Sequence, residues 1–282
     1  MNAPMNAPMN DLMSTPTNDL ITRYTDRIGY DGPLEPTLAH LRRIHEAHLY
    51  RVPFENFSMH RNAERGLTGE VLHEVIVEDR RGGICFETGR MMERLLDACG
   101  FAYGIRLGSG CDPHPTPATH QVFVVELDGE RLLFDIGYGA RGPRGVLPLV
   151  DGAELAHPAL STRVRLDRAS GAPVWTVSVK EHAVGAADWQ DIYRFADVPA
   201  GELDLEMAHF YTTSSPHSLL NRYKVASIPT ADGRVSVRDG HLTVVADGRS
   251  TTTPITEAAE LQEAVGRHFG LAVSPRDLGL ER

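Results

Sequence analysis

RGGICFETG, residues 81–89, is the stretch from which the rest of this chain is interpreted. Its two glycines allow a tight backbone turn and the close approach of a ligand. Apolar residues at helical spacing follow, and Gly100 can end the helix, so the pattern predicts a helix that begins near Cys85. The unpaired amides and the dipole at such a helix start favour a thiolate. Cys85 is therefore a candidate nucleophile, and the same amides could stabilise an oxyanion on the carbonyl that it attacks.

The alternative interpretation of Cys85 is a buried structural cysteine, which is a common role for this residue type. Cys99 fits that role because it lies on the apolar stripe of the same predicted helix. With Cys111 the chain has three cysteines, at spacings typical of neither a disulfide framework nor a zinc site. A reducing cytosol is the simplest setting for such a chain. Local chemistry alone leaves both interpretations of Cys85 open.

Helices are also predicted upstream of Cys85. Asn18 or Asp19 can cap a first helix that runs towards Gly29, and Thr68 can cap a third. A second helix opens at Pro36 and must stop before Pro53. Its histidines do not form an HExxH zinc motif, and a solvated helix face is the expected place for them (His40, His45 and His48).

Downstream of Gly100 the pattern changes to short β-like segments, and Asp128-Gly129 between two of them is a strong hairpin signal. Periodicity weakens over 185–215, where we expect a connection with a short helix near 203–210; a hairpin-like pair and a last helix, Thr256 to Phe269, follow. The expected fold class is α+β, with a helical bundle, a β-barrel and an α/β lid. The expected divisions are a disordered extension (1–17), the helical bundle (18–99), the barrel (100–195), a connecting segment (196–215) and the lid (216–282).

His120 is singled out among thirteen histidines because it opens the alternating strand HQVFVVEL after a proline-rich loop. A two-residue hairpin loop makes Leu127 face Glu130. In that register His120 faces Gly137, and Asp135 lies on the same face as its diagonal neighbour. A carboxylate there would orient the imidazole and stabilise its charged form. The competing interpretations are a surface histidine at a strand end and a solvated strand carboxylate.

Composition limits the function classes. The net charge of −10 comes without a basic cluster, which disfavours nucleic acid as a partner, and an anionic ligand would need local donors. We find no apolar run of 18 residues and no signal peptide, so we expect a cytoplasmic protein without a membrane partner. The pair Cys111 and His114 is too small a ligand set for a metal site, and none is expected.

Five motifs in order resemble those of the arylamine N-acetyltransferases. They are the entry segment 24–56 with RIGY and PFEN, RGGICF, THQVFVV (119–125), DIGYG (135–139) and TSSPHS (213–218). The resemblance implies a helical bundle, a β-barrel and an α/β lid around a papain-like core. It also implies ping-pong transfer of an acetyl group from acetyl-CoA to an arylamine or arylhydrazine, as in xenobiotic metabolism, with no metal. By the same matching, Cys85, His120 and Asp135 form the catalytic triad, Tyr138 lines the amine pocket, and three residues approach CoA (Thr116, Tyr211 and His217).

The chain departs from that family at Gly89, where the family usually has asparagine, and at His217 and Leu219, which are small and polar in some relatives. Two other functions remain open. One is an amide synthase of the macrolactam type, which would take a carrier-bound acyl chain on the same scaffold. The other is a cysteine hydrolase or a non-catalytic binding protein of this fold. The preferred amine, the acyl length and the oligomeric state do not follow from the sequence.

Overall fold

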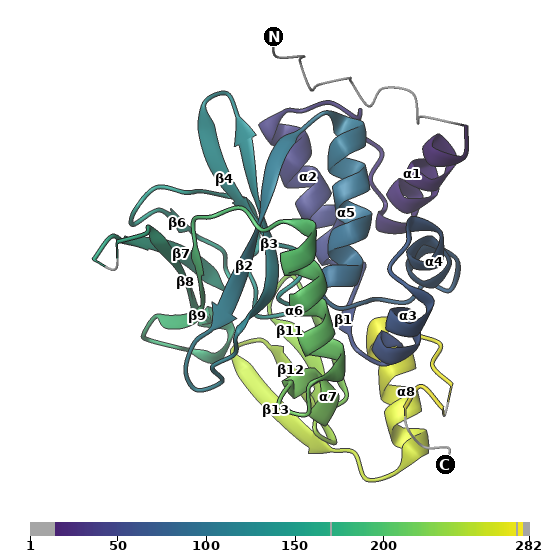
Figure 1. The fold of residues 1–282 in the computed structure, drawn as a ribbon. Helices are drawn as coiled ribbons and strands as arrows, with labels where there is room; N and C mark the ends of the chain where they lie inside the picture. The colour runs from purple at the N-terminus through teal and green to yellow at the C-terminus, as the bar shows by residue number, and fades with distance from the viewer. Residues whose placement is uncertain (1–14, 170, 275, 279–282) are drawn as a thin grey trace.

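A computed structural model describes residues 15–169, 171–274 and 276–278. Helices gather on one side of the molecule, a curled β-sheet forms the other side, and a second sheet with the C-terminal helix lies below both (Figure 1). The helices of the first hundred residues are α1 (Thr15–Ile28), α2 (Leu38–Leu49), α3 (Met59–Arg65), α4 (Gly69–His73), the π-helical turn η1 (Glu74–Glu78) and α5 (Cys85–Cys99).

The helix caps follow local chemistry at two of the predicted positions. The Thr68 side chain accepts from the Val71 amide and begins α4, and Gly100 ends α5 with a positive φ of 77°. The second helix, expected to open at Pro36, begins two residues later at Leu38 and is capped by Thr37. The predicted cap at Asn18 or Asp19 is wrong, because α1 already begins at Thr15. Residues 1–14 of the expected extension lie outside the described residues.

An eight-stranded antiparallel sheet forms the middle of the chain, in the order β5-β4-β3-β2-β9-β8-β7-β6. The predicted hairpin is confirmed: Asp128 and Gly129 have positive φ angles of 52° and 81°, and Leu127 pairs with Glu130. The strands of the eight-stranded sheet are β2 (Ala102–Gly110), β3 (Ala118–Leu127), β4 (Glu130–Phe134), β5 (Leu147–Pro148), β6 (Glu154–Leu155), β7 (Ser161–Asp167), β8 (Val174–Lys180) and β9 (Gln190–Ala196), with the short 3-10 turn η2 (His182–Val184) before β9.

β9 corrects the expectation of an irregular connection over 185–215. The strand pairs with both β2 and β8, and its pairing with β8 shifts register between Val177 and Ser178. Ile192 and Tyr193 are consecutive and both buried, so the strand lacks the strict alternation by which a strand is recognised. The helix expected near 203–210 is present and longer, as α6 (Glu202–Ser214).

The second sheet has five strands and joins distant parts of the chain. Its order is β1-β10-β11-β12-β13, so the dipeptide β1 (Phe54–Glu55), from among the first helices, pairs with β10. β13 escaped sequence analysis because it is exposed along its length and has no apolar face. The remaining elements are α7 (Leu219–Arg222), β10 (Val225–Pro229), β11 (Arg234–Arg238), β12 (His241–Ala246), β13 (Arg249–Pro254) and α8 (Ala258–Phe269).

Separate apolar clusters lie beneath the helices, inside the curl of the large sheet and between the second sheet and α8. We expected the histidines of α2 to lie on a solvated face. This is wrong for His45 and His48, whose side chains are buried in the protein interior. Across the described ranges, no helix combines the length and the apolarity that crossing a membrane requires.

Candidate active site

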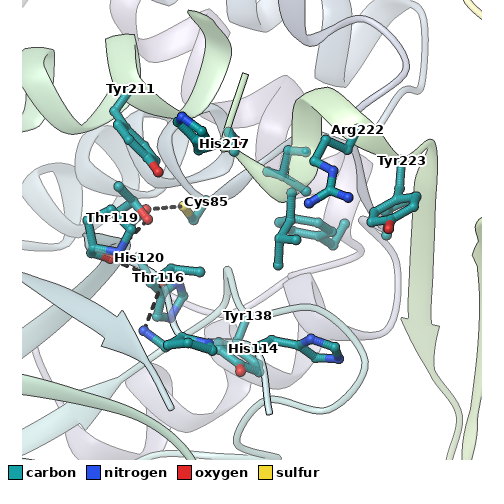
Figure 2. Close-up of a pocket in the computed structure, with 18 of the residues that line it drawn as sticks. Cys85, His114, Thr116, Thr119, His120, Tyr138, Tyr211, His217, Arg222 and Tyr223 are labelled. Atoms are coloured by element: carbon teal, nitrogen blue, oxygen red, sulfur yellow. Dashed lines mark hydrogen bonds between the residues drawn. The ribbon is translucent and has the colours of Figure 1, made fainter. Parts of the chain in front are cut away.

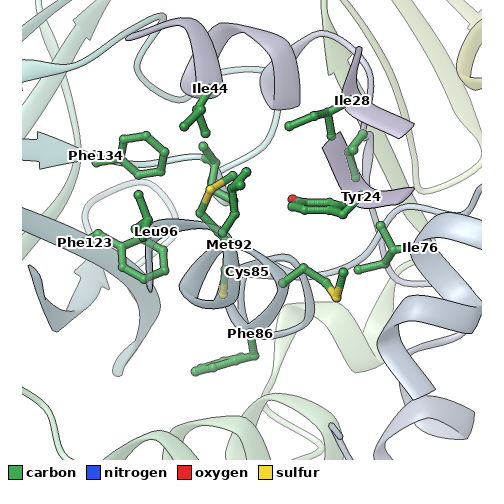
Figure 3. Close-up of a cluster of buried hydrophobic side chains, with 14 of the residues drawn as sticks. Tyr24, Ile28, Ile44, Ile76, Cys85, Phe86, Met92, Leu96, Phe123 and Phe134 are labelled. Atoms are coloured by element: carbon green, nitrogen blue, oxygen red, sulfur yellow. The ribbon is translucent and has the colours of Figure 1, made fainter. Parts of the chain in front are cut away.

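Cys85 is the first residue of α5, as the sequence predicts. The helix start is fixed from below, because the Glu87 carboxylate accepts the Ile84 N–H at 2.8 Å and the Asn62 amide at 2.5 Å. Cys85 belongs to the apolar cluster under the helices (Figure 3), yet the residue keeps 6% of its surface exposed. Its Sγ lies 3.7 Å from the carbonyl oxygen of Thr119. The thiol is therefore held between a packed helix and the strand that carries His120.

Gly137 allows the loop after β4 to approach this thiol. A Cβ atom on Gly137 would lie 2.7 Å from the Cβ of Cys85 and 3.0 Å from its Cα, closer than real Cβ contacts allow. A side chain at position 137 would therefore push α5 away from the loop. The glycine is required here by space and not by a left-handed backbone, which distinguishes it from Gly139, whose φ is 81°.

His120 and Asp135 meet as the hairpin register predicts. The His120 Nε2 lies 3.0 Å from Asp135 Oδ2, and both residues are at least nine-tenths buried. The Asp135 carboxylate also accepts the Tyr193 hydroxyl at 2.7 Å and the Gly137 N–H at 2.9 Å. With Nε2 directed to the carboxylate, Nδ1 is the ring nitrogen that remains for Cys85.

The electrostatics of this group favour an ion pair. Burial opposes the charged form of His120, but the Asp135 carboxylate and contact with the Cys85 thiol outweigh it and raise the pKa of His120 above its ordinary value. Burial likewise opposes the Asp135 carboxylate, and His120, Tyr193 and the Gly137 amide together lower its pKa. His120 is therefore a stronger proton acceptor than a free imidazole, and the imidazolium that forms when it takes a proton lies beside a carboxylate.

A cavity of about 490 Å³ opens above Cys85 and His120 (Figure 2). Its wall includes every residue for which the family resemblance implied ligand contacts, namely Thr116, Tyr138, Tyr211 and His217. The Tyr138 ring lies edge-on to His120 at 5.1 Å, and its hydroxyl donates to the Ile192 carbonyl at 3.0 Å. Thr116 accepts the Gly110 N–H at 2.9 Å, which fixes the proline-rich loop at the cavity rim. Six of the seven proposed site residues thus line one space, and the seventh, Asp135, is buried behind it in contact with His120.

Two buried residues that sequence analysis missed contact Asp135. Tyr193, on β9, reaches the carboxylate from within the large sheet, and its ring packs on His120 at 4.8 Å. His45, on α2, holds the Asp135 main chain, since its Nε2 lies 2.8 Å from the carbonyl oxygen. Burial lowers the pKa of His45 to about 4, so the ring is neutral and donates this bond. Tyr193 had no clear signal in the sequence, because its strand lacks strict alternation, and His45 had none beyond the apolar stripe beside it.

Gly89 is where the chain departs from the family pattern. The space that a side chain at this position would need is filled by a neighbouring residue. A Cβ atom at this position would lie 2.6 Å from Nε2 of Gln121, which is buried and also donates to Glu93 at 3.3 Å. Gln121 follows His120 on β3 and points to the opposite side of the strand. Its amide therefore fills the space between the cysteine helix and the histidine strand.

The site contains no obvious metal centre: within the described ranges, no three or more His, Cys, Asp or Glu side chains lie close enough together to hold an ion. Cys111 lies partly exposed on the proline-rich loop, and burial raises its pKa. Cys99 is packed in the helical core, where burial raises its pKa to about 11. Cys85 is the cysteine that faces the cavity and the histidine.

Comparison with known proteins gives the same family from sequence and from structure. A family model described as N-acetyltransferase matches residues 37–278. The arylamine N-acetyltransferase of Mycolicibacterium smegmatis is 29% identical over 88% of this chain and 90% of its own length, and that of Escherichia coli K12 is 26% identical over 90% and 89%. The solved structure of the Mycobacterium abscessus arylamine N-acetyltransferase superposes with a TM-score of 0.86 at 26% identity, covering 94% of both chains. The chain belongs to the arylamine N-acetyltransferase family, a family of acyltransferases.

Proposed function

We propose that this protein transfers an acetyl group from acetyl-CoA to arylamines or arylhydrazines by a ping-pong mechanism through an acetyl-Cys85 intermediate. The observation that carries the proposal is the placement of His120 between the Asp135 carboxylate and the Cys85 thiol at one cavity wall. A thiol beside an oriented imidazole is the arrangement that nucleophilic catalysis by cysteine needs. The arrangement resembles that of papain-like cysteine enzymes, and we expect it to operate in the cytoplasm.

In the first half-reaction His120 accepts the Sγ proton and the Cys85 thiolate attacks the thioester carbonyl carbon. The amides at the start of α5 stabilise the oxyanion. The bond from carbon to the CoA sulfur then breaks, and the CoA thiolate takes the proton from His120. Asp135 keeps the ring in the orientation that both proton transfers require.

In the second half-reaction the amine nitrogen attacks the acetyl-cysteine carbonyl. His120 removes the proton from that nitrogen and returns it to the departing Cys85 sulfur, so the product is an amide and the enzyme is restored. Tyr138 lines the side on which we place the amine. Thr116, Tyr211 and His217 line the side on which we place CoA.

A burst experiment tests the central step. Enzyme mixed with acetyl-CoA in the absence of amine is expected to release about one CoA per active site and to gain one acetyl group on Cys85 by intact mass and peptide mapping. An added aniline or hydrazine should discharge the adduct, and double-reciprocal plots at several amine concentrations should be parallel. The control, Cys85→Ser, should give neither burst nor adduct, because a hydroxyl is not deprotonated near neutral pH.

Three results would contradict this mechanism. Intersecting plots without an acyl-enzyme would mean direct transfer in a ternary complex. An adduct formed only from a carrier-bound acyl chain would indicate an amide synthase. Steady CoA release without amine would indicate a hydrolase that admits water to the acyl-cysteine.

A further inference from the structure

The active-site cavity differs in charge from the rest of the protein. The whole chain carries a net charge of −10, yet among the described residues that line the cavity there is no Asp or Glu. The lining includes two guanidinium groups, Arg222 and Arg238, and the imidazoles of His114, His120 and His217. A cavity lined by one sign of charge concentrates ligands of the opposite sign. This cavity therefore suits a ligand with an anionic part.

The two arginines share one aromatic ring. The Cζ of Arg222 lies 5.5 Å, and that of Arg238 5.3 Å, from the centre of the Tyr223 ring. The register explains the convergence, because Arg238 pairs with Val225, and Tyr223 precedes Val225 by two residues. A guanidinium that rests on an aromatic face keeps its N–H groups available at its edges.

The backbone beneath these arginines is fixed by a buried amide. Asn56, 2% exposed, donates to the carbonyls of Leu220 and Tyr223 at 2.7 and 2.8 Å and accepts the Val225 N–H at 2.8 Å. Figure 2 shows Arg222 and Tyr223 on the far side of the cavity from Thr119 and His120. Arg222 therefore lies across the cavity from His120, and Arg238 contacts the same Tyr223 ring.

Neither arginine is neutralised within the described part of the chain, since no carboxylate there forms an ion pair with Arg222 or Arg238. On the same strand as Arg238, by contrast, Arg234 is paired with Glu181 at 2.6 Å. The paired N–H donors of a planar guanidinium group match the spacing of two oxygen atoms of a phosphate or a carboxylate. The donors at this wall are therefore available to a ligand.

We propose that Arg222 and Arg238 together bind an oxyanion carried by the ligand in the active-site cavity. The inference rests on the proposed function, which supplies two sources of that chemistry. One is a phosphate of the CoA donor, and the other is the carboxylate of an acceptor such as an aminobenzoate. Both arginine side chains are exposed, so the anion stays at the water-facing rim while the reacting end of the ligand lies at Cys85.

Direct binding tests this assignment without turnover, so its outcome is separate from that of the acetyl-transfer experiment. Calorimetric titration would compare the full-length wild type with Arg222→Gln, Arg238→Gln and the double variant. The probes are CoA, pantetheine as its phosphate-free counterpart, 4-aminobenzoate, and 4-methylaniline as a neutral counterpart. Arg249→Gln is the matched control, because it removes the same charge from an exposed position on β13 outside the cavity.

The double variant is expected to bind one anionic probe about tenfold more weakly, with its neutral counterpart and the control unchanged. Selective loss of CoA identifies phosphate as the bound group, and selective loss of 4-aminobenzoate identifies carboxylate. The affinity of that probe for the wild type should fall with added salt more steeply than for the double variant. Melting temperatures check folding, and each single variant retains one guanidinium. Unchanged affinity for both anionic probes, equal losses for charged and neutral probes, or no binding of either anion by the wild type would overturn the proposal.

Discussion

Asp135 is the residue at which distant parts of the chain converge. Its carboxylate accepts hydrogen bonds from His120 on β3, Tyr193 on β9 and the Gly137 amide, and its carbonyl accepts one from His45 on α2. Oδ2 is bonded to His120 and Tyr193 and Oδ1 accepts the Gly137 N–H, so both oxygens of a carboxylate that burial would otherwise penalise heavily have donors. The charge on Asp135 is therefore maintained by His120 and Gly137, which the sequence places near it, and by Tyr193, which it does not.

Asp135→Asn and Tyr193→Phe should separate the roles of these partners. Asparagine cannot stabilise the imidazolium, so kcat/KM should fall by about 10³–10⁴ in a folded variant. Phenylalanine keeps the ring against His120 but removes one donor to a charged group, and a fall of about 10–100-fold is expected.

The pH dependence of kcat/KM provides the check. The lost hydroxyl donor should raise the pKa of Asp135 and weaken its hold on His120, so the activity profile of Tyr193→Phe should move. Equal activity and an unmoved profile would show that the Tyr193 hydroxyl does not act on the site.

Glu87 gives folding a pH dependence of its own. Burial raises the pKa of this carboxyl to about 7, against 4.5 for the unburied group. Between these values the folded protein keeps a proton that the unfolded chain has lost. The contribution of Glu87 to the free energy of unfolding is therefore greatest below about pH 4.5. It declines as pH rises to about 7, by roughly 3 kcal/mol at most.

Urea unfolding at several pH values would measure this contribution. Glu87→Gln should flatten the decline, and the exposed Glu64→Gln should leave it unchanged. The same decline in Glu87→Gln would assign it to other groups.

At the scale of elements, the site depends on the spacing of α5 and β3. Cys85 and Gly89 are one turn apart on α5, while His120 and Gln121 are adjacent on β3. The Gln121 amide fills the volume that a side chain at position 89 would need. Any change in that volume changes the distance between the thiol and the imidazole.

Gly89→Ala should therefore lower stability by about 1–3 kcal/mol and lower kcat more than it raises KM. Gln121→Ala should remove the obstacle, so the double variant should recover part of both losses, and a double-mutant cycle measures the coupling. Additive effects would mean that the two residues do not set the spacing.

The elements that local chemistry encodes were predictable, and those that depend on distant partners were not. Asp128 and Gly129 adopt the positive φ angles of a tight hairpin, and that turn sets the register of β3 against β4, from which the neighbouring positions of His120 and Asp135 were predicted. β9 takes its shape from two neighbours and a register shift, so its sequence lacks a clean period. Tyr193 was missed for the same reason. No feature of the sequence near Gly89 indicates that a side chain 32 positions later occupies its space.

At the scale of the whole molecule, a buried ionic network joins the first hundred residues to the last. Arg81, 3% exposed, pairs with both oxygens of Glu55 at 3.1 and 3.3 Å and with Asp277 at 3.3 Å. Glu55 lies in β1, so the network connects the second sheet, the approach to α5 and the end of the chain.

Arg81→Met should destabilise the protein by about 3–5 kcal/mol, because it leaves Glu55 buried and without its counter-charge. Combining it with Glu55→Gln should recover part of the loss. Denaturant unfolding of the two variants gives the comparison, and no recovery in the pair would mean that Arg81 acts mainly through packing.

The pairing of β1 with β10 also determines when the enzyme can mature. Phe54 pairs with Ser227, 173 positions later, and Gly108 in β2 pairs with Phe195, 87 positions later. At about 5–20 residues per second, β1 leaves the ribosome roughly 10–35 s before its partner strand exists. Contacts of such large sequence separation also slow refolding. Because Tyr193 enters with β9 and Arg222 later still, a nascent chain contains Cys85 before the tyrosine that contacts Asp135 and before the arginine that lines the cavity.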